Sequence, residues 1–446
     1  MNAAPPILLD LVGIGFGPAN LALALVLDEH GRRGGDLLRQ VFLERHSRFS
    51  WHPGMLLGGA RMQVPFLKDL VTQRDPTSPY SFLCYLKECG RLSDFINLRD
   101  FFPTRLEFHD YLEWCAQAVS NVVRYSHEVV RIQPGLPTGG TITALTVVAH
   151  GPDGIERAYL TRAVSLAMGI PPRLPFGLRP SSRIWHASEF IPRLEALGSV
   201  VPPGTRFAVV GAGQSAAEAV CHLLDRFPQI RVHAVVSRYG FMPADSSPFV
   251  NGIFDPDSVD RFFAMDPALR AFVHEIHAGT NYGAVDECVI KALFERHYAD
   301  RVAGRDRLVF ENLSRLAGVE EGQSTLRLTL APARGDGSRT LDVDYLVCAT
   351  GYEPVPPDHL LVPELRDLLV RDTSGALVLD RDYRIRTHDN LRALLYVQGC
   401  CEASHGLSAT LLSNLAPRAG EIRDSVAAHL TALAMDCRSI TGAQRP

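Results

Sequence analysis

The sequence predicts an α/β fold with two Rossmann-like dinucleotide-binding domains and a smaller substrate-binding region interleaved between them. Two glycine-rich turns carry this prediction, because each follows an apolar strand and opens an apolar helix. Two long aromatic-rich stretches, 46–115 and 239–300, interrupt the domains, and insertions of that length usually form a ligand pocket or lid. We expect three parts: residues 1–172 with the first insertion, residues 173–340 with the second, and residues 341–446, which return to the first domain and end in a helix.

The first glycine-rich turn follows the apolar run at residues 8–12. It has the sequence Gly13-Ile14-Gly15-Phe16-Gly17-Pro18-Ala19-Asn20 and leads into an apolar helical run. Backbone N–H groups and the positive end of a helix dipole then face one point, where a pyrophosphate binds. Counted from Gly13, Pro18 stands where the usual G-x-G-x-x-G pattern has its third glycine.

A carboxylate ends the next predicted strand. Residues 40–44 form a short apolar run that stops at Glu44, at about the separation expected for the acid that hydrogen bonds a ribose hydroxyl. The alternative is an ordinary charge at a strand end. Together, the glycine pattern and the acid predict a dinucleotide site.

The second turn combines an apolar strand from residue 206, the pattern Gly211-Ala212-Gly213-Gln214-Ser215-Ala216 and the start of an amphipathic helix. The next strand, 231–236, is followed by Arg238 and by no carboxylate. An acid there would repel a 2′-phosphate, whereas an arginine pairs with it, so NADPH is favoured over NADH. Two turns imply two dinucleotides. The alternative is a duplicated fold in which one site has lost its function.

Composition excludes several other classes of protein. The 446 residues are 46% hydrophobic, with a net charge of −4 and a pI near 6.5, and no basic run supports nucleic-acid binding. The N-terminus lacks the pattern of a signal peptide or a membrane span. Nine cysteines without a C-x-x-C pair predict neither a disulfide framework nor a metal site, so we expect a reducing cytoplasm. Cys400 and Cys401 are either a redox pair or ordinary small core residues.

Periodicity predicts the remaining elements. Apolar residues at helical spacing predict helices over 80–92, 106–119 and 285–299. Short β-rich runs between residues 122 and 148 suit either an antiparallel meander or a crossover piece. A buried strand is expected at 164–170, before a Pro171-Pro172 linker. One strand is expected from Leu341 to the small-residue turn at 349–352.

Further motifs follow the two turns in a fixed order. They are Trp51-His52-Pro53-Gly54-Met55, Gln63-Val64-Pro65-Phe66-Leu67-Lys68-Asp69-Leu70, Asp75-Pro76-Thr77-Ser78-Pro79, Thr280-Asn281-Tyr282, Ala349-Thr350-Gly351-Tyr352 and Leu411-Leu412-Ser413. With both turns, this series resembles the microbial N-hydroxylating flavoprotein monooxygenases, the family of the lysine N6- and ornithine N5-hydroxylases. The resemblance covers residues 8–425.

The resemblance implies FAD in the first site, NADPH in the second and L-ornithine in a small pocket between them. It also implies a homotetramer. It assigns the cofactors to Gly13, Gly15, Gly17, Pro18, Asn20, Glu44, Trp51, His52, Gln63, Val129, Gly211, Gly213, Gln214, Ser215, Ala216, Arg238, Asn281, Thr350, Gly351, Thr410, Leu411 and Leu412. It assigns the substrate to Gln63, Lys68, Asn251, Asn281 and Ser413.

The implied reaction is the NADPH- and O₂-dependent conversion of L-ornithine to N5-hydroxyornithine, for hydroxamate siderophores or related peptides. NADPH would reduce FAD, O₂ would give a C4a-hydroperoxyflavin, and the substrate amine would attack its distal oxygen. No catalytic side chain is expected, and Asn281 positions the substrate and NADP. The attacking amine must be neutral, although its reference pKa is about 10.4, so we expect the rate and the coupling to rise with pH.

Lys68 favours an amino acid over a diamine, because a cation binds an α-carboxylate and repels an ammonium group. The alternative for Lys68 is a surface lysine. Ornithine and lysine differ by one methylene, and only the resemblance selects ornithine. Hydroxylation of lysine or of a diamine therefore stays open, as do a Baeyer–Villiger-type monooxygenase and a non-catalytic flavoprotein. A disulfide-reductase flavoprotein would need a correctly spaced redox cysteine pair, which the sequence lacks.

Overall fold

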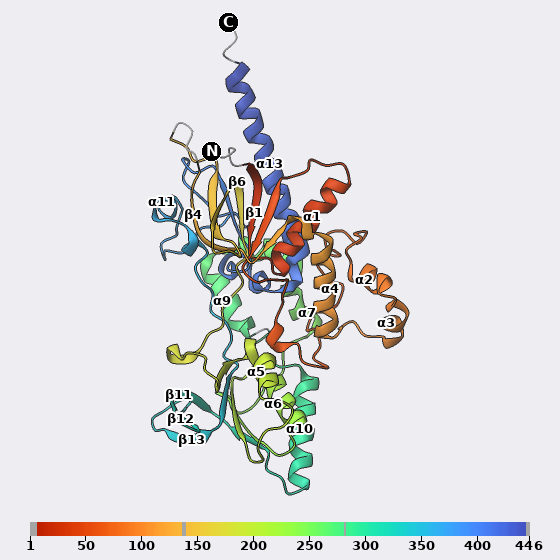
Figure 1. The fold of residues 1–446 in the computed structure, drawn as a ribbon, viewed down its shortest axis with the longest axis vertical. Helices are drawn as coiled ribbons and strands as arrows, with labels where there is room; N and C mark the ends of the chain where they lie inside the picture. The colour runs from red at the N-terminus through yellow and green to blue at the C-terminus, as the bar shows by residue number, and fades with distance from the viewer. Residues whose placement is uncertain (1–6, 136–139, 281, 443–446) are drawn as a thin grey trace.

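The computed structural model describes residues 7–135, 140–280 and 282–442, and it is built around two sheets at opposite ends of an elongated molecule (Figure 1). The first sheet has the order β3-β2-β1-β6-β5-β4, with β15 paired to β6. Its strands are β1 (Leu8–Ile14), β2 (Gln40–Glu44), β3 (Val123–Tyr125), β4 (Glu128–Pro134), β5 (Leu145–His150), β6 (Glu156–Leu166) and β15 (Leu394–Val397). The pairs among β3, β2, β1, β6 and β15 are parallel, whereas β4, β5 and β6 form an antiparallel meander, the first of the two alternatives from the sequence.

The second sheet is parallel throughout and has the order β10-β9-β8-β14-β7. Its strands are β7 (Ile184–His186), β8 (Arg206–Val210), β9 (Arg231–Val235), β10 (Leu308–Glu311) and β14 (Tyr345–Cys348). A small antiparallel sheet of β11 (Ser314–Glu321), β12 (Leu326–Pro332) and β13 (Arg339–Val343) lies beside it. Two Rossmann-like sheets confirm the predicted fold class.

Helices cover both sheets. In the first domain, α1 (Pro18–Arg32) is buried from residue 20 to residue 27 and lies against α13 (Leu415–Gly442), the long helix that ends at the top of Figure 1. In the second domain, α6 (Gln214–Arg226) packs on α10 (Glu287–Val302), with α5 (Phe190–Ala196) nearby. The strand-to-helix order of each domain follows from the apolar runs around its glycine turn.

The two insertions form short helices. The first contains α2 (Phe82–Glu88), α3 (Leu92–Leu98) and α4 (Arg105–Ala118), so two of the three predicted helices lie here and the third is α10. Phe66 stacks on Phe101 and touches Phe82 and Phe95, which packs this insertion into the first core. The second insertion contains α7 (Pro248–Asn251), α8 (Pro256–Ala264) and α9 (Pro267–His277), and in Figure 1 α7 and α9 lie between the two sheets.

Two predictions of strand extent were wrong. The strand expected at 164–170 ends at Leu166, and the single strand expected from Leu341 is two strands in different sheets, β13 and β14. They separate at Asp344, whose carboxylate accepts a hydrogen bond from the backbone N–H of Arg206 at 2.7 Å. Because β14 belongs to the second sheet, the return to the first domain follows Cys348 rather than beginning at residue 341.

The two connections between the domains run side by side. Pro172 and Tyr352 form an antiparallel bridge, the N–H of Arg173 donates to Gly351 O at 3.0 Å, and the N–H of Glu353 donates to Pro171 O at 3.0 Å. The predicted linker at residues 171–172 is thus one half of a paired two-segment connection.

Candidate active site

The two glycine turns are built alike. Gly15 and Gly211 are the first residues after β1 and β8, and both adopt positive φ, 79° and 150°. A Cβ on Gly15 would lie 2.4 Å from Ala167 O, and a Cβ on Gly211 would lie 2.3 Å from Ala349 O. Each glycine therefore lets its turn approach the neighbouring parallel strand closely, which no other residue permits.

This equivalence corrects the register expected for the first turn. Gly15, Gly17 and Asn20 match Gly211, Gly213 and Ala216, so Asn20 and not Pro18 stands at the third position of the pattern. Pro18 is the first residue of α1, where a missing N–H costs nothing. Asn20 is fully buried, and its amide donates to Gly15 O at 2.7 Å and accepts from Ser165 Oγ and Gln398 Nε2, at 2.8 and 2.9 Å. It therefore holds the turn from inside the protein.

Both helices after the turns begin without a side-chain cap. Gly17 and Gly213 are their N-cap residues, and neither first turn contains an acid. A Cβ on Gly17 would meet no atom within 4 Å, so the space in front of α1 is open. Uncapped N–H groups and a helix dipole fit a dinucleotide pyrophosphate at each turn, although the second turn is closer to its neighbours, since a Cβ on Gly213 would lie 3.5 Å from Gly283 Cα.

Glu44 lies at the end of β2, beside the first turn. One carboxylate oxygen accepts from the N–H of Phe16 at 2.7 Å, and the other accepts from the N–H of His46 at 2.8 Å. The matching position in the second domain is Val236, because Leu43 and Val235 accept from Gly15 and Gly211 in the same way. Only the first domain thus carries the acid expected for a ribose, as the sequence predicts.

An aromatic group lies where the first insertion meets the paired connection. The ring of His52 is 4.9 Å from that of Trp51 and 6.3 Å from that of Tyr352, which in turn is 5.2 Å from the ring of His186. His186 Nε2 lies 3.0 Å from Gly351 O. Desolvation lowers the pKa of His52 to about 4, and the charge of Arg105 adds to the effect, so this ring is neutral at pH 7.

The two insertions meet at the carbonyl of Phe254. Lys68 Nζ, from the first insertion, donates to Phe254 O at 3.4 Å and lies 3.6 Å from Asp255 Oδ1. The Asn414 amide, in the orientation that satisfies both of its ends, donates to the same carbonyl at 3.3 Å and to Ser413 O at 3.2 Å. Asn251 lies three residues before Phe254, and its amide donates to Ser246 O at 3.0 Å. The structure therefore gathers the segments that carry Lys68, Asn251 and Ser413.

Arg238 follows β9, as expected, and its guanidinium donates to Gly283 O at 2.6 Å. It thus joins the second turn's edge of the sheet to the loop that leads into α10. Asn281 falls outside the described residues. Tyr282, next to it, donates to the carboxylate of Glu402.

The other predicted cofactor residues lie around these groups. Thr350 donates to Arg173 O, and Gly351 has φ 78°, so both shape the paired connection. Ser215 and Ala216 begin α6, Val129 lies on β4, and Thr410, Leu411 and Leu412 precede α13. Thr410 Oγ1 donates to Glu402.

Sequence reasoning missed a polar network that links the two domains. Arg105 donates to both oxygens of Glu218, each at 2.9 Å, and to Met55 O at 2.7 Å. Gln214 Nε2 lies 2.9 Å from Glu218 Oε1 and 3.1 Å from Asp286 Oδ2. Gln63 Nε2 donates to the other oxygen of Asp286 at 3.0 Å. Gln63 and Gln214 were predicted as site residues, but nothing in the sequence pairs either of them with Asp286.

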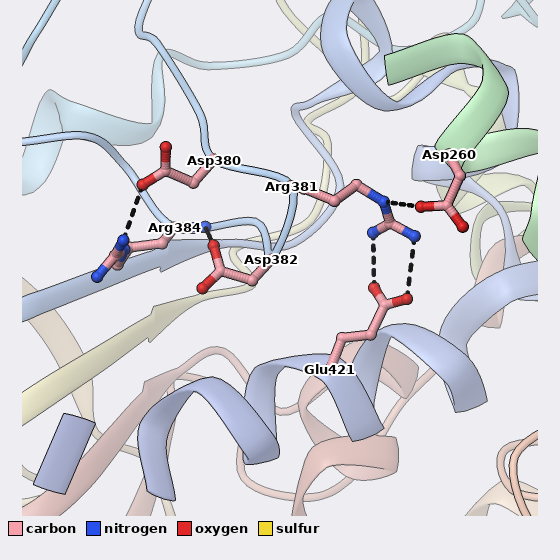
Figure 2. Close-up of a pocket in the computed structure, with 6 residues that line it drawn as sticks. All are labelled: Asp260, Asp380, Arg381, Asp382, Arg384 and Glu421. Atoms are coloured by element: carbon pink, nitrogen blue, oxygen red, sulfur yellow. Dashed lines mark hydrogen bonds and ion pairs between the residues drawn. The ribbon is translucent and has the colours of Figure 1, made fainter. Parts of the chain in front are cut away.

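A second charged cluster fixes the second insertion. It surrounds a recess of about 420 Å³. The lining side chains, drawn in Figure 2, are Asp260, Asp380, Arg381, Asp382, Arg384 and Glu421. Arg381 donates to both oxygens of Glu421 on α13, at 2.8 and 3.0 Å, and to Asp260 on α8 at 2.5 Å. The Arg381 guanidinium is thus bound by carboxylates of α13 and α8. These ion pairs hold α8, which begins directly after Asp255, against α13.

Within the described part of the chain, no three histidine, cysteine or acidic side chains are arranged to hold a metal ion. The same residues contain no helix that is long and apolar enough to cross a membrane. Cys400 and Cys401 are free thiols, and burial raises the pKa of Cys401 to about 11. These properties favour ordinary core residues over a redox pair.

Two Rossmann-like domains with uncapped glycine turns, facing a shared pair of insertions, define a protein that binds two dinucleotides around one small-molecule site. Residues 7–354 match the family model described as L-lysine 6-monooxygenase/L-ornithine 5-monooxygenase. The chain belongs to this family.

Individual relatives agree with this assignment. An L-ornithine N(5)-monooxygenase of Burkholderia cepacia is 42% identical over 405 residues, 89% of each chain. The ornithine N-hydroxylase of Kutzneria sp. 744 superposes with a TM-score of 0.89 at 44% identity, over 94% of this chain and 99% of the other. The ornithine hydroxylase of Pseudomonas aeruginosa gives 0.88 at 36% identity, over 95% and 100%.

Proposed function

We propose that this protein is an FAD-dependent, NADPH-using monooxygenase that hydroxylates the side-chain nitrogen of L-ornithine to give N5-hydroxyornithine. Its family membership supports the reaction class. The observation that supports an amino-acid substrate is the meeting of the two insertions at Phe254, where the side chain of Lys68 is only 20% exposed. The Kutzneria relative is described with reduced FAD, NADP⁺ and L-ornithine bound.

FAD would occupy the first turn. The N–H groups at the start of α1 would face its pyrophosphate, and Glu44 would hold its ribose. NADPH would occupy the second turn, where Arg238 would pair with the 2′-phosphate. FAD supplies the redox and oxygen chemistry when bound, and the protein contributes binding, orientation and exclusion of water. No side-chain nucleophile is required.

The substrate would be held at its far end. Lys68 would bind the α-carboxylate, and Asn251, Asn281 and Ser413 would add hydrogen bonds from the surrounding segments. Such anchoring leaves the side-chain amine free to reach into the space between the cofactors. A desolvated surrounding disfavours the ammonium form and so supplies the neutral lone pair that attack on oxygen requires.

This arrangement favours an amino acid over a diamine, because Lys68 would repel a second ammonium group. It does not separate ornithine from lysine, which differ by one methylene. The identity to ornithine hydroxylases supports ornithine. The test is to purify the protein, record its flavin absorbance and follow NADPH oxidation with and without ornithine. Bound FAD and ornithine-dependent oxidation are expected, whereas a colourless protein that does not take up FAD would refute the proposal.

The location and assembly of the protein are further proposals. We place it in the cytoplasm, where NADPH is available, and infer that it forms a homo-oligomer, by its resemblance a tetramer. Apolar side chains support self-association, because Phe294, Tyr298 and Val302 are exposed along one stripe of α10. Light scattering on the purified protein gives the mass of the assembly, and a monomer would contradict this inference.

A further inference from the structure

The polar network between the domains is an open chain of hydrogen bonds, which we call the Asp286 network. It consists of Gln63, Asp286, Gln214, Glu218 and Arg105, joined by the hydrogen bonds given above. Gln63 and Arg105 belong to the first insertion, whereas Gln214 and Glu218 begin α6. Asp286 immediately precedes α10 and contacts both glutamines. Together with the Arg105–Glu218 pair, it joins the first insertion to the helix that follows the second turn.

A carboxylate only accepts hydrogen bonds, so an amide that faces it must present its NH₂ group. Asp286 Oδ1 lies 3.0 Å from Gln63 Nε2, and Asp286 Oδ2 lies 3.1 Å from Gln214 Nε2. Both glutamine amides are thereby fixed in one of their two orientations. The N–H of Asp286 also donates to Gln214 Oε1 at 2.8 Å, which fixes this amide from its other end.

The fixed orientations have a direct chemical consequence. Gln63 Oε1 lies on the side of its amide away from Asp286, so it is presented as an acceptor. Gln214 is the first residue of α6, next to the N–H groups that would face the NADP pyrophosphate. Its partner Glu218 is in turn held by Arg105, and both side chains of this bidentate pair are largely buried. The orientation of Gln63 therefore depends on the Asp286 carboxylate, whereas Gln214 is held by that carboxylate together with Glu218 and the backbone N–H of Asp286.

We propose that Asp286 is a positioning residue that couples the two dinucleotide sites by fixing the amides of Gln63 and Gln214. This inference rests on the proposed function, in which Gln214 borders NADP and Gln63 borders FAD and the substrate amine. Asp286 would act through the two amides and not by contacting a cofactor itself. It keeps Gln63 Oε1 available to accept from the amine N–H while it holds the second turn in its binding geometry.

Asp286→Asn tests this role, because asparagine has the same shape but only one acceptor. Its single side-chain oxygen can serve only one of the two NH₂ groups in this arrangement, so the other NH₂ group is left facing an N–H donor. We expect the Kd for NADP⁺, measured by calorimetry on the FAD-loaded protein, to rise about tenfold. We also expect the fraction of oxidised NADPH that yields hydroxylated product to fall by about half or more, with the KM for ornithine within about twofold. Asp286→Glu keeps both acceptor oxygens and should restore part of the NADP⁺ affinity.

Asp225→Asn is the matched control. It removes the same charge from an ion pair with Arg296 at the far end of α6. If Asp286→Asn and Asp225→Asn bind NADP⁺ equally well, the inference is overturned. Gln63→Leu removes the Gln63 amide from the same contact. In the double variant with Asp286→Asn, the fraction of oxidised NADPH that yields product should be no lower than in Gln63→Leu alone. A larger loss in the double variant would also overturn it.

The two measurements, NADP⁺ affinity and the yield of hydroxylated product, separate this inference from the proposed function. NADP⁺ binding does not depend on ornithine, so a loss of affinity in Asp286→Asn stands even if the wild-type protein forms no hydroxylated ornithine. A wild-type protein that hydroxylates ornithine, together with an unchanged Asp286→Asn variant, would refute the inference alone.

Discussion

Lys68 and Asp255 form an ion pair that joins the two insertions, with Nζ 3.6 Å from Oδ1. The lysine side chain is only 20% exposed, whereas the aspartate is 55% exposed. The ammonium group thus faces a protein-lined site and not bulk solvent. Under the proposed function, the α-carboxylate of the substrate would take the place of the Asp255 carboxylate beside Lys68. Two predictions follow from this ion pair: loss of the lysine should raise the KM for ornithine, whereas neutralising the aspartate should lower it.

Lys68→Ala should raise the KM for ornithine by about 10²-fold, because a charge-assisted hydrogen bond worth on the order of 3 kcal/mol is lost. Steady-state kinetics with ornithine as the varied substrate measure this change. Lys87→Ala, at an exposed position on α2, is the matched control and should leave KM unchanged. An unaltered KM in Lys68→Ala would remove this lysine from the substrate site.

Asp255→Asn should lower the KM for ornithine by about threefold. The substrate carboxylate must displace Asp255 from Lys68, and the exposed position of Asp255 keeps the cost of that competition below about 1 kcal/mol. The same assay checks the sign. If KM rises instead, Asp255 itself binds the substrate, through the α-ammonium group, and the displacement model is wrong.

Arg238→Ala should raise the KM for NADPH by about 10²-fold and leave the KM for NADH nearly unchanged. Only NADPH carries the 2′-phosphate that the guanidinium would pair with. NADH serves as the internal control, because loss of the contact between Arg238 and Gly283 O would affect both cofactors equally. Equal effects on the two nucleotides would assign Arg238 to loop structure alone.

The stability of the protein should fall between about pH 6.5 and pH 4. Burial lowers the pKa of His405 to about 4, while its Nε2 lies 3.1 Å from Arg381 O and its ring stacks on Tyr383. In this window the unfolded chain binds a proton that the folded chain does not, so acid favours unfolding, by up to about 3 kcal/mol for this group.

Thermal unfolding between pH 4 and pH 7 measures this effect. His405→Gln should flatten the decline of Tm with falling pH, and His388→Gln, at an exposed position, should not. A decline of the same slope in His405→Gln and the wild-type protein would show that other groups control acid stability.

Features encoded by neighbouring residues were predictable from the sequence. Both glycine turns, the acid at Glu44 and Arg238 after β9 occur as expected, because strand, turn and helix are signalled by adjacent residues. The register of the first turn was misassigned, since Gly13, Gly15 and Gly17 allow two alignments of one pattern. Only the end of β1 at Ile14 decides between them.

Pairs far apart in the chain were not predictable. Gln63 and Asp286 are 223 positions apart, and Arg105 and Glu218 are 113 apart. No periodicity links such residues, because their contact depends on how the two domains pack. Asp255 was missed for the same reason, although Lys68 was identified. The division between β13 and β14 was also hidden, since their apolar runs are separated only by Asp344.

Direct detection of the product tests the central claim most closely. The purified FAD-loaded protein is given NADPH and O₂ with ornithine, lysine or putrescine, and hydroxylated amine and H₂O₂ are both quantified by mass spectrometry and a peroxidase assay. We predict N5-hydroxyornithine in near-equal amount to the NADPH consumed, with little product from lysine and putrescine. NADPH consumption that yields only H₂O₂ with all three amines would contradict the account.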